Sequence, residues 1–306
     1  MRSHVLHRGP LPRRPLHSCS CASLCRSEDA PGRSASLRSA RRCYEWRSTE
    51  HQAGLGRRLQ EVLEARRRIA ETSSELQELV PLGALLADLG EFEEADRTYL
   101  KAIQYYRDVS PFALAWVCFQ LGVLWGETVP QPQSRRAAHW YELALGYLPS
   151  YISARVHLSE IYLNDGDLEG AEALLAPVVA SGDPEVNWRL SEVLEARSKS
   201  KEADVQRNAA RSGFESLLVR HELAFADHAV EFYLSSGANP QRACDLARVN
   251  LANRPTRRAF ELAHAAALRA GDQQLASELL AEAGRQPAYT NGVAHSAFST
   301  QSISSI

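Results

Sequence analysis

The sequence has no apolar run of the roughly 20 residues that a membrane-spanning helix needs. Its first residues also lack the apolar core of a secretory signal. Beyond residue 43 the only cysteines are Cys118 and Cys244, too few for a disulfide framework. These absences predict a protein of a reducing compartment with no membrane span, and we expect it in the cytoplasm.

Catalytic motifs are missing as well. The sequence contains no G-x-x-x-x-G-K-[ST], no G-x-G-x-x-G after a strand, no H-E-x-x-H and no G-x-S-x-G. His221 and His228 lie seven residues apart, near Glu222 and Asp227, and we interpret them as solvated or packed histidines rather than a metal site. The sequence therefore predicts a protein that is not an enzyme, with no catalytic residue, no cofactor and no metal site.

Basic residues are concentrated at the start of the chain. Residues 1–43 hold nine arginines and two acids, a net +7, which leaves −9 for the remainder of a chain whose formal net charge is −2. Phosphate contacts require a cationic face, so the acidic remainder argues against nucleic-acid binding.

The basic leader has two other interpretations. An Arg-rich, acid-poor start resembles a mitochondrial transit peptide, but Pro10, Pro12 and Pro15 interrupt an amphipathic helix, which favours a disordered extension. Its segment HSCSCASLC lacks the paired spacing of a closed zinc site, and we interpret these cysteines as free thiols. Mitochondrial import and a metal-binding leader remain the alternatives.

What the sequence does contain is a recurring helical pattern. Leu79, Leu82, Gly83 and Leu86 are spaced by three and four residues, as on one face of a helix. Gly90 is expected to end that helix, because glycine tolerates the left-handed conformation of a C-terminal cap. A second helix follows, and its inner stripe recurs downstream: Ala95, Tyr99 and Ala102, then Ala137, Tyr141 and Ala144. The small residues allow two helices to approach closely, and the aromatic ring fills the space beside them.

Six alanines mark this pattern along the chain: Ala95, Ala137, Ala171, Ala203, Ala243 and Ala276. Their spacings are 42, 34, 32, 40 and 33 residues, a period near 34 with two insertions. Together with W/L-x-x-L-G-x-x-Y and A-x-x-x-F/Y-x-x-A, this pattern resembles the tetratricopeptide-repeat family, its uncharacterised bacterial members in particular. The resemblance covers about Leu76 to Gly284, and it departs from the family at Arg207 and Glu231. A generic Ala-rich bundle, the alternative, has no reason to keep the period.

The resemblance implies an all-α fold, a right-handed superhelical solenoid of about six antiparallel helix pairs. We expect residues 75–285 to form the repeats and residues 44–74 an amphipathic helix that caps them. The leader 1–43 and the polar tail 286–306 are expected to be disordered.

The family also implies a function, a non-enzymatic scaffold or adaptor that binds a peptide segment or partner surface. In the family the first helix of each repeat lines a concave groove, and the matching residues here combine aromatics with carboxylates. They are Trp116, Phe119, Val123, Val156, Glu160, Leu163, Asn164, Trp188, Glu192, Glu195, Phe225, His228 and Phe232. Such a groove is expected to prefer a basic or apolar segment.

Three alternatives stay open at this point. Trp116, Trp188 and Phe232 are also compatible with a covered core position. The chain is also compatible with a regulatory repeat subunit of an enzyme complex. An RNA-binding helical-repeat protein is the third alternative, against which the acidic body counts.

Overall fold

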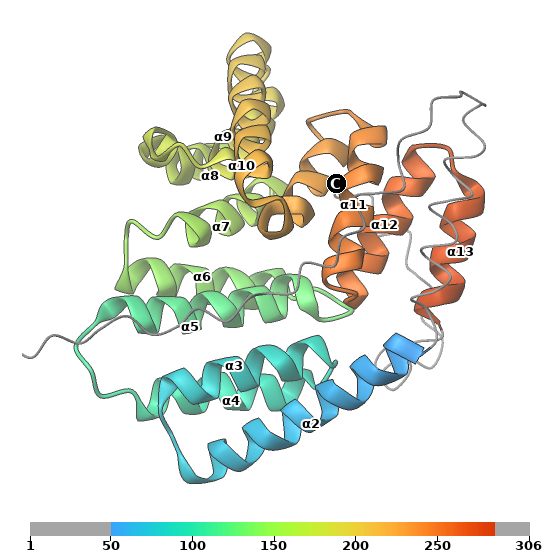
Figure 1. Ribbon diagram of the computed structural model, residues 1–306. Helices are drawn as coiled ribbons and strands as arrows, with labels where there is room; N and C mark the ends of the chain where they lie inside the picture. The colour runs from blue at the N-terminus through green and yellow to red at the C-terminus, as the bar shows by residue number, and fades with distance from the viewer. Residues whose placement is uncertain (1–49, 285–306) are drawn as a thin grey trace, which may run out of the picture. The chain divides into compact units, whose positions relative to one another are not determined.

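The computed structural model describes the backbone of residues 50–284 and the side chains of residues 60–284 (Figure 1). The predicted leader 1–43 and tail 286–306 therefore lie outside the described residues. Contacts divide the chain between His51 and Gln52, and the fold below is that of the second unit, Gln52–Ile306.

The described part of the chain is all helical, which confirms the predicted all-α class. Its α-helices are α2 (Glu50–Thr72), α3 (Leu76–Asp88), α4 (Phe92–Tyr105), α5 (Pro111–Val123), α6 (Ser134–Tyr147), α7 (Ile152–Asn164), α8 (Leu168–Leu175), α9 (Pro184–Ala196), α10 (Ser200–Leu234), α11 (Pro240–Asn253), α12 (Arg257–Arg269) and α13 (Gln273–Ala283). A π-helical turn, η1 (Leu124–Thr128), extends α5, and a 3-10 turn, η2 (Ala176–Ser181), extends α8. No helix in residues 50–284 is both long and apolar enough to cross a bilayer.

Consecutive helices pack against each other in the described unit. The helix α3 packs on α4, α5 on α6, α7 on α8 and α12 on α13, while α10 packs on both α9 and α11 (Figure 1). The helix α2 adds Leu63 and Ala70 to the core of α3 and α4, and its Arg67 forms an ion pair with Glu94, 2.6 Å away.

The marker alanines of the sequence pattern form the core of these pairs. Ala95, Ala137, Ala171, Ala203, Ala243 and Ala276 each expose at most 2% of their surface. Tyr99 and Tyr141 are equally buried, at 2% and 1%. The prediction that these alanines and tyrosines form the inner stripe of a second helix is confirmed.

In the pairs α3–α4 and α5–α6, a glycine of the first helix allows the second helix to approach closely. A Cβ atom built on Gly83 would lie 2.6 Å from the ring of Tyr99, and one on Gly122 would lie 2.3 Å from the ring of Tyr141. Both distances are too short for a real side chain, so the tyrosine ring rests directly on the backbone of the facing helix. This contact is the physical reason for the recurring Gly and Tyr.

Residues with a left-handed backbone conformation follow five of the helices. Gly90, Gly166 and Gly271 follow α3, α7 and α12 with φ of 84°, 83° and 79°. Ser198 (φ 60°) follows α9, and Ala238 (φ 48°) follows α10. A side chain makes this backbone conformation less favourable, so the last two turns carry strain that the glycine turns avoid.

The helix α10 contains a kink. His221 has non-helical dihedral angles (φ −146°, ψ 49°) and divides α10 into two helical parts. Phe214 of the first part and Phe232 of the second pack ring against ring with each other and with Trp188 of α9, with centroids 5.2 to 6.2 Å apart. Such aromatic packing contributes stability beyond the burial of apolar area.

Candidate functional site

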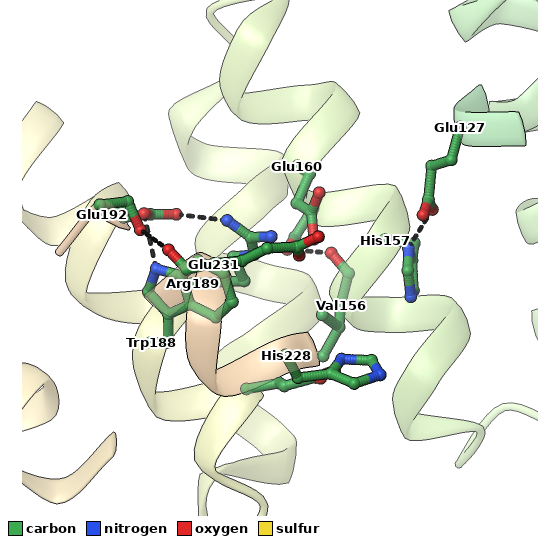
Figure 2. Close-up of polar contacts among 12 residues, drawn as sticks. Glu127, Val156, His157, Glu160, Trp188, Arg189, Glu192, His228 and Glu231 are labelled. Carbon is green, nitrogen blue, oxygen red and sulfur yellow. Dashed lines mark hydrogen bonds and ion pairs between the residues drawn. The ribbon is translucent and has the colours of Figure 1, made fainter. Parts of the chain in front are cut away.

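Charged side chains from α7, α9, α10, η1 and the start of α12 gather in one region of the structure, shown in part in Figure 2. We call this set the ion cluster: Glu127, His157, Glu160, Glu185, Arg189, Glu192, Asp227, His228, Glu231, Arg254 and Arg258. Each of its members has at least one oppositely charged neighbour within ion-pair distance.

Glu127 connects three elements at one end of the cluster. Its Oε1 atom lies 2.6 Å from Nδ1 of His157 and accepts a hydrogen bond of 3.2 Å from the hydroxyl of Tyr141. Its Oε2 atom lies 3.3 Å from Nη1 of Arg258, whose Nη2 atom forms an ion pair with Glu231. The carboxylate is therefore held from α6, α7 and α12 at once.

Arg189 is the corresponding centre on α9. Its Nε atom lies 2.8 Å from Glu160 and its Nη1 atom 3.1 Å from Glu192, and its guanidinium group stacks 3.6 Å above the ring of Trp188. Glu192 also accepts hydrogen bonds from the indole N–H of Trp188 at 2.7 Å and from the hydroxyl of Ser236 at 2.8 Å (Figure 2). Because the guanidinium group has fixed planar donors, these contacts set the orientation of both carboxylates.

His228 completes the cluster on α10. Its Nδ1 atom forms an ion pair with Glu185 of α9, and its Nε2 atom lies 3.9 Å from Asp227. Asp227 in turn lies 2.6 Å from Arg254, just before α12. The kinked second part of α10 is thus tied to the helices on both sides of it.

Burial and the neighbouring carboxylates shift the pKa values of His157 and His228 in opposite directions. Burial lowers the pKa of His157, but the charge and contact of Glu127 outweigh it and raise the pKa to about 9. The same balance, with Glu185 as the main partner, raises the pKa of His228 to about 9. Both imidazoles therefore carry a positive charge at neutral pH, and the sites hold fixed charges rather than an acid and a base poised near pH 7.

The carboxylates of the cluster are not equivalent. Burial raises the pKa of Glu185, but contact with His228 outweighs burial and brings it to about 2. The pKa of Glu160 is raised, because burial, with repulsion from Glu127 and Glu192, exceeds the attraction of Arg189 and His157. The surroundings therefore disfavour the charge of Glu160 but favour that of Glu185.

An aromatic ladder leads from the surface to the ion cluster. Its members are Phe112, Tyr151, Phe119, Tyr141 and His157. Ring centroids lie 6.2 Å apart for Phe112 and Tyr151, 5.4 Å for Tyr151 and Phe119, and 5.1 Å for Phe119 and His157. Phe112, at the start of α5, is 56% exposed, whereas Tyr141 is 1% exposed. The aromatic ladder therefore runs from a solvent-exposed ring, Phe112, to a buried ring, Tyr141.

The structure corrects the groove prediction at three positions. Val156, Trp188 and Phe232 are 1%, 2% and 0% exposed, so they are core residues and offer no surface to a partner. The physical reason is that α10 packs on α9, so Trp188 of α9 and Phe232 of α10 lie against each other in the core, while Val156 packs with residues of α8 and α9. For Trp188 and Phe232 the alternative core interpretation is the right one.

The other predicted groove residues fall into two groups. Glu160, Glu192 and His228 meet in the ion cluster, and Phe119 belongs to the aromatic ladder. The rest do not share one site: Trp116, Val123, Leu163 and Phe225 are half-buried against the core, and Asn164 and Glu195 are exposed. Glu195 also receives hydrogen bonds from Ser200 and Arg207.

The charge argument for a basic partner is also weakened. It treated Glu160 and Glu192 as free carboxylates, yet both are paired with Arg189. The single positive charge of Arg189 offsets one of these two negative charges, so the carboxylates offer a basic segment less free charge than the sequence suggests. The basic or apolar partner segment stays a prediction.

Sequence reasoning missed most of the ion cluster. Glu127, Glu185, Arg189, Glu231 and Arg258 were not predicted. A signal was present in the helical spacing, since Glu185, Arg189 and Glu192 recur at i, i+4 and i+7, and His228 and Glu231 at i, i+3. Such spacing is equally typical of a solvated helix face, so only the tertiary contacts distinguish the two. Among residues 60–284 no group of three or more His, Cys, Asp or Glu side chains is placed so that it could hold a metal ion.

Comparisons with known proteins add little to this description. No protein-family model matches the chain, and no curated protein matches it. Among solved structures the chain is similar to the crystal structure of BtubC (BKLC) from P. vanneervenii, with 19% identity over 78% of this chain and 92% of that one. The TM-score is 0.30, and a likeness of that size carries no argument about function.

Proposed function

We propose that the chain is a binding scaffold of the tetratricopeptide-repeat type. Its helix pairs would wind into a right-handed superhelical solenoid of about six repeats, without an enzymatic activity of its own. The close contacts of Gly83 with Tyr99 and of Gly122 with Tyr141 support this proposal, because they repeat one packing arrangement in successive helix pairs.

We propose further that the ladder around Phe112 binds an apolar segment of a protein partner. The observation that carries this step is the exposure of Phe112, whose ring is 56% exposed and lies beside the half-buried Tyr151. Aromatic side chains, Phe among them, are enriched at protein–protein interfaces relative to the rest of the surface. The aromatic character of Phe112 and Tyr151 favours an apolar segment as the partner.

The test is partner capture with a single surface substitution. Phe112→Ala is expected to reduce the amount of captured partner at least tenfold relative to the parent, measured by quantitative mass spectrometry on eluates from the native host. Val205→Ala, which removes another exposed apolar side chain (64% exposed) from α10, is the matched control and is expected to leave capture unchanged. Equal capture by the parent and both variants would refute the assignment of the ladder.

Phe119 is a poorer probe than Phe112, although the sequence singled it out. Its ring lies 5.1 to 5.7 Å from the rings of Tyr141, Tyr151 and His157. Removing it would leave a cavity, so loss of partner and loss of stability could not be separated.

A further inference from the structure

Five ion pairs connect five elements in a closed order. They join η1 to α7, α7 to α9, α9 to α10, α10 to α12 and α12 back to η1: Glu127–His157, Glu160–Arg189, Glu185–His228, Glu231–Arg258 and Arg258–Glu127. We call this arrangement the ion circuit. Four of its links join elements that are close in the chain, whereas the fifth joins residues 131 positions apart.

The fifth link lies where backbone packing is sparse. The helix α12 packs against α10, α11 and α13, and η1 packs against α3, α5 and α6. The two elements are not among each other's main packing neighbours. The contact between Arg258 and Glu127 is therefore a side-chain bridge between elements that share little backbone packing.

We propose that Arg258 and Glu127 form a latch that holds η1 and α12 at a fixed separation. The closed state is the one in which Arg258 contacts Glu127 and Glu231 together, and the open state lacks the contact with Glu127. In the open state the apolar cores of the helix pairs, to which Trp125 of η1 and Phe260 of α12 contribute, stay packed.

The local structure of η1 suits this role. Its π-helical turn displays Glu127 directly before the loop Val129–Gln133, where the alanine spacing is lengthened to 42 residues. Single π-turns are rare and often occur at functional positions. Tyr141 of α6 and His157 of α7 hold the Glu127 carboxylate in place. Its position therefore does not depend on the contact with Arg258.

The other side of the latch is accessible to solvent. The Arg258 side chain is 49% exposed and that of Glu127 is 26% exposed. Ion pairs with this exposure are individually weak and are screened by salt. A bridge of this strength opens without unfolding of the helices, which distinguishes a latch from a core contact.

The experiment follows the distance between residues close to η1 and to α12. Two fluorophores are attached to unnatural amino acids at Gln131, in the loop after η1, and at Ala252, near the end of α11, both exposed, in the full chain, and their distance distribution is measured by time-resolved energy transfer. Arg258→Met keeps an unbranched apolar stem but removes the guanidinium charge, and we expect a longer and broader distance distribution. Arg257→Met is the matched control, because Arg257 pairs only within α12, with Glu261 at 2.8 Å, and the parent distribution should persist.

Salt supplies a second measurement that does not depend on the folding of a variant. At about 1 M salt the Debye length is about 3 Å, so the distribution of the parent should lengthen toward that of Arg258→Met. The variant itself should change little with salt, and Arg258→Lys should restore the closed distribution at low salt. The latch is refuted if the parent distance is insensitive to salt, or if Arg258→Met and Arg257→Met give the same distribution.

Discussion

The substitution Gly122→Ala tests the close approach of α5 and α6. The added Cβ would lie 2.3, 2.5 and 2.7 Å from three ring carbons of Tyr141, whereas ordinary contact begins at 3.4 Å. The ring cannot turn away easily, because it is 1% exposed, stacks near Phe119 and His157, and has its hydroxyl bonded to Glu127. We therefore expect the two helices to separate.

The magnitude follows from two opposing effects. Overpacking of a well-packed core typically costs about 1–3 kcal/mol. Alanine is favoured over glycine within a helix by about 1 kcal/mol, which offsets part of that cost. The two effects together give a net loss of up to about 2 kcal/mol in the free energy of unfolding. Each kcal/mol lost lowers the melting temperature by about 2–4 °C in a domain of this size.

The assay is urea denaturation followed by far-ultraviolet circular dichroism and tryptophan fluorescence. Gly146→Ala is the matched control on α6, because a Cβ at Gly146 meets no atom within 4 Å, and it should leave stability unchanged or raise it. In a Tyr141→Leu background the cost of Gly122→Ala should shrink, since the ring that it meets is absent. Equal stabilisation by Gly122→Ala and Gly146→Ala would refute the reasoning.

Three further predictions concern pH, a turn and a helix cap. The pKa of His157 in the folded protein is about 9, above its ordinary value of 6.5. The pair with Glu127 therefore contributes at most about 3 kcal/mol to the free energy of unfolding. This contribution is complete below pH 6.5 and is lost as pH rises through 9. Melting temperatures should fall over that window, and less steeply for His157→Gln. Ala238→Gly should raise the free energy of unfolding by up to about 1 kcal/mol, and with it the urea midpoint, because φ is 48° at this residue. A lower midpoint would contradict the backbone strain. Asp272→Ala should cost about 1 kcal/mol, since Asp272 caps α13 by accepting a hydrogen bond from the N–H of Leu275, and Asp272→Asn should restore most of it.

The sequence was sufficient for the helices and their buried stripes. The alanines at 95 and 137, with Tyr99 and Tyr141, repeat at helical spacing, and burial of such a stripe depends mainly on neighbours close in the chain. Gly90 likewise predicted the end of the helix before it, because the left-handed conformation is a local property of the backbone.

The site could be predicted only in part. The sequence singled out Phe119, Glu160, Glu192 and His228, and the structure places them in the ladder or the ion cluster. It gave no indication that Arg189 pairs with both glutamates. A charged residue on a helix face shows the same spacing whether it meets solvent or another helix, so pairing across helices leaves no local pattern.

What the tertiary structure alone decided is which faces are covered. Trp188 and Phe232 carry the pattern of groove residues, yet the packing of α10 on α9 leaves both buried. Arg258 meets Glu127 across 131 residues, which also depends on tertiary packing. The sequence determined the periodic helices, because their hydrogen bonds and stripes are local. The contacts between distant helices depend on how the helices are arranged in three dimensions, which no short segment encodes.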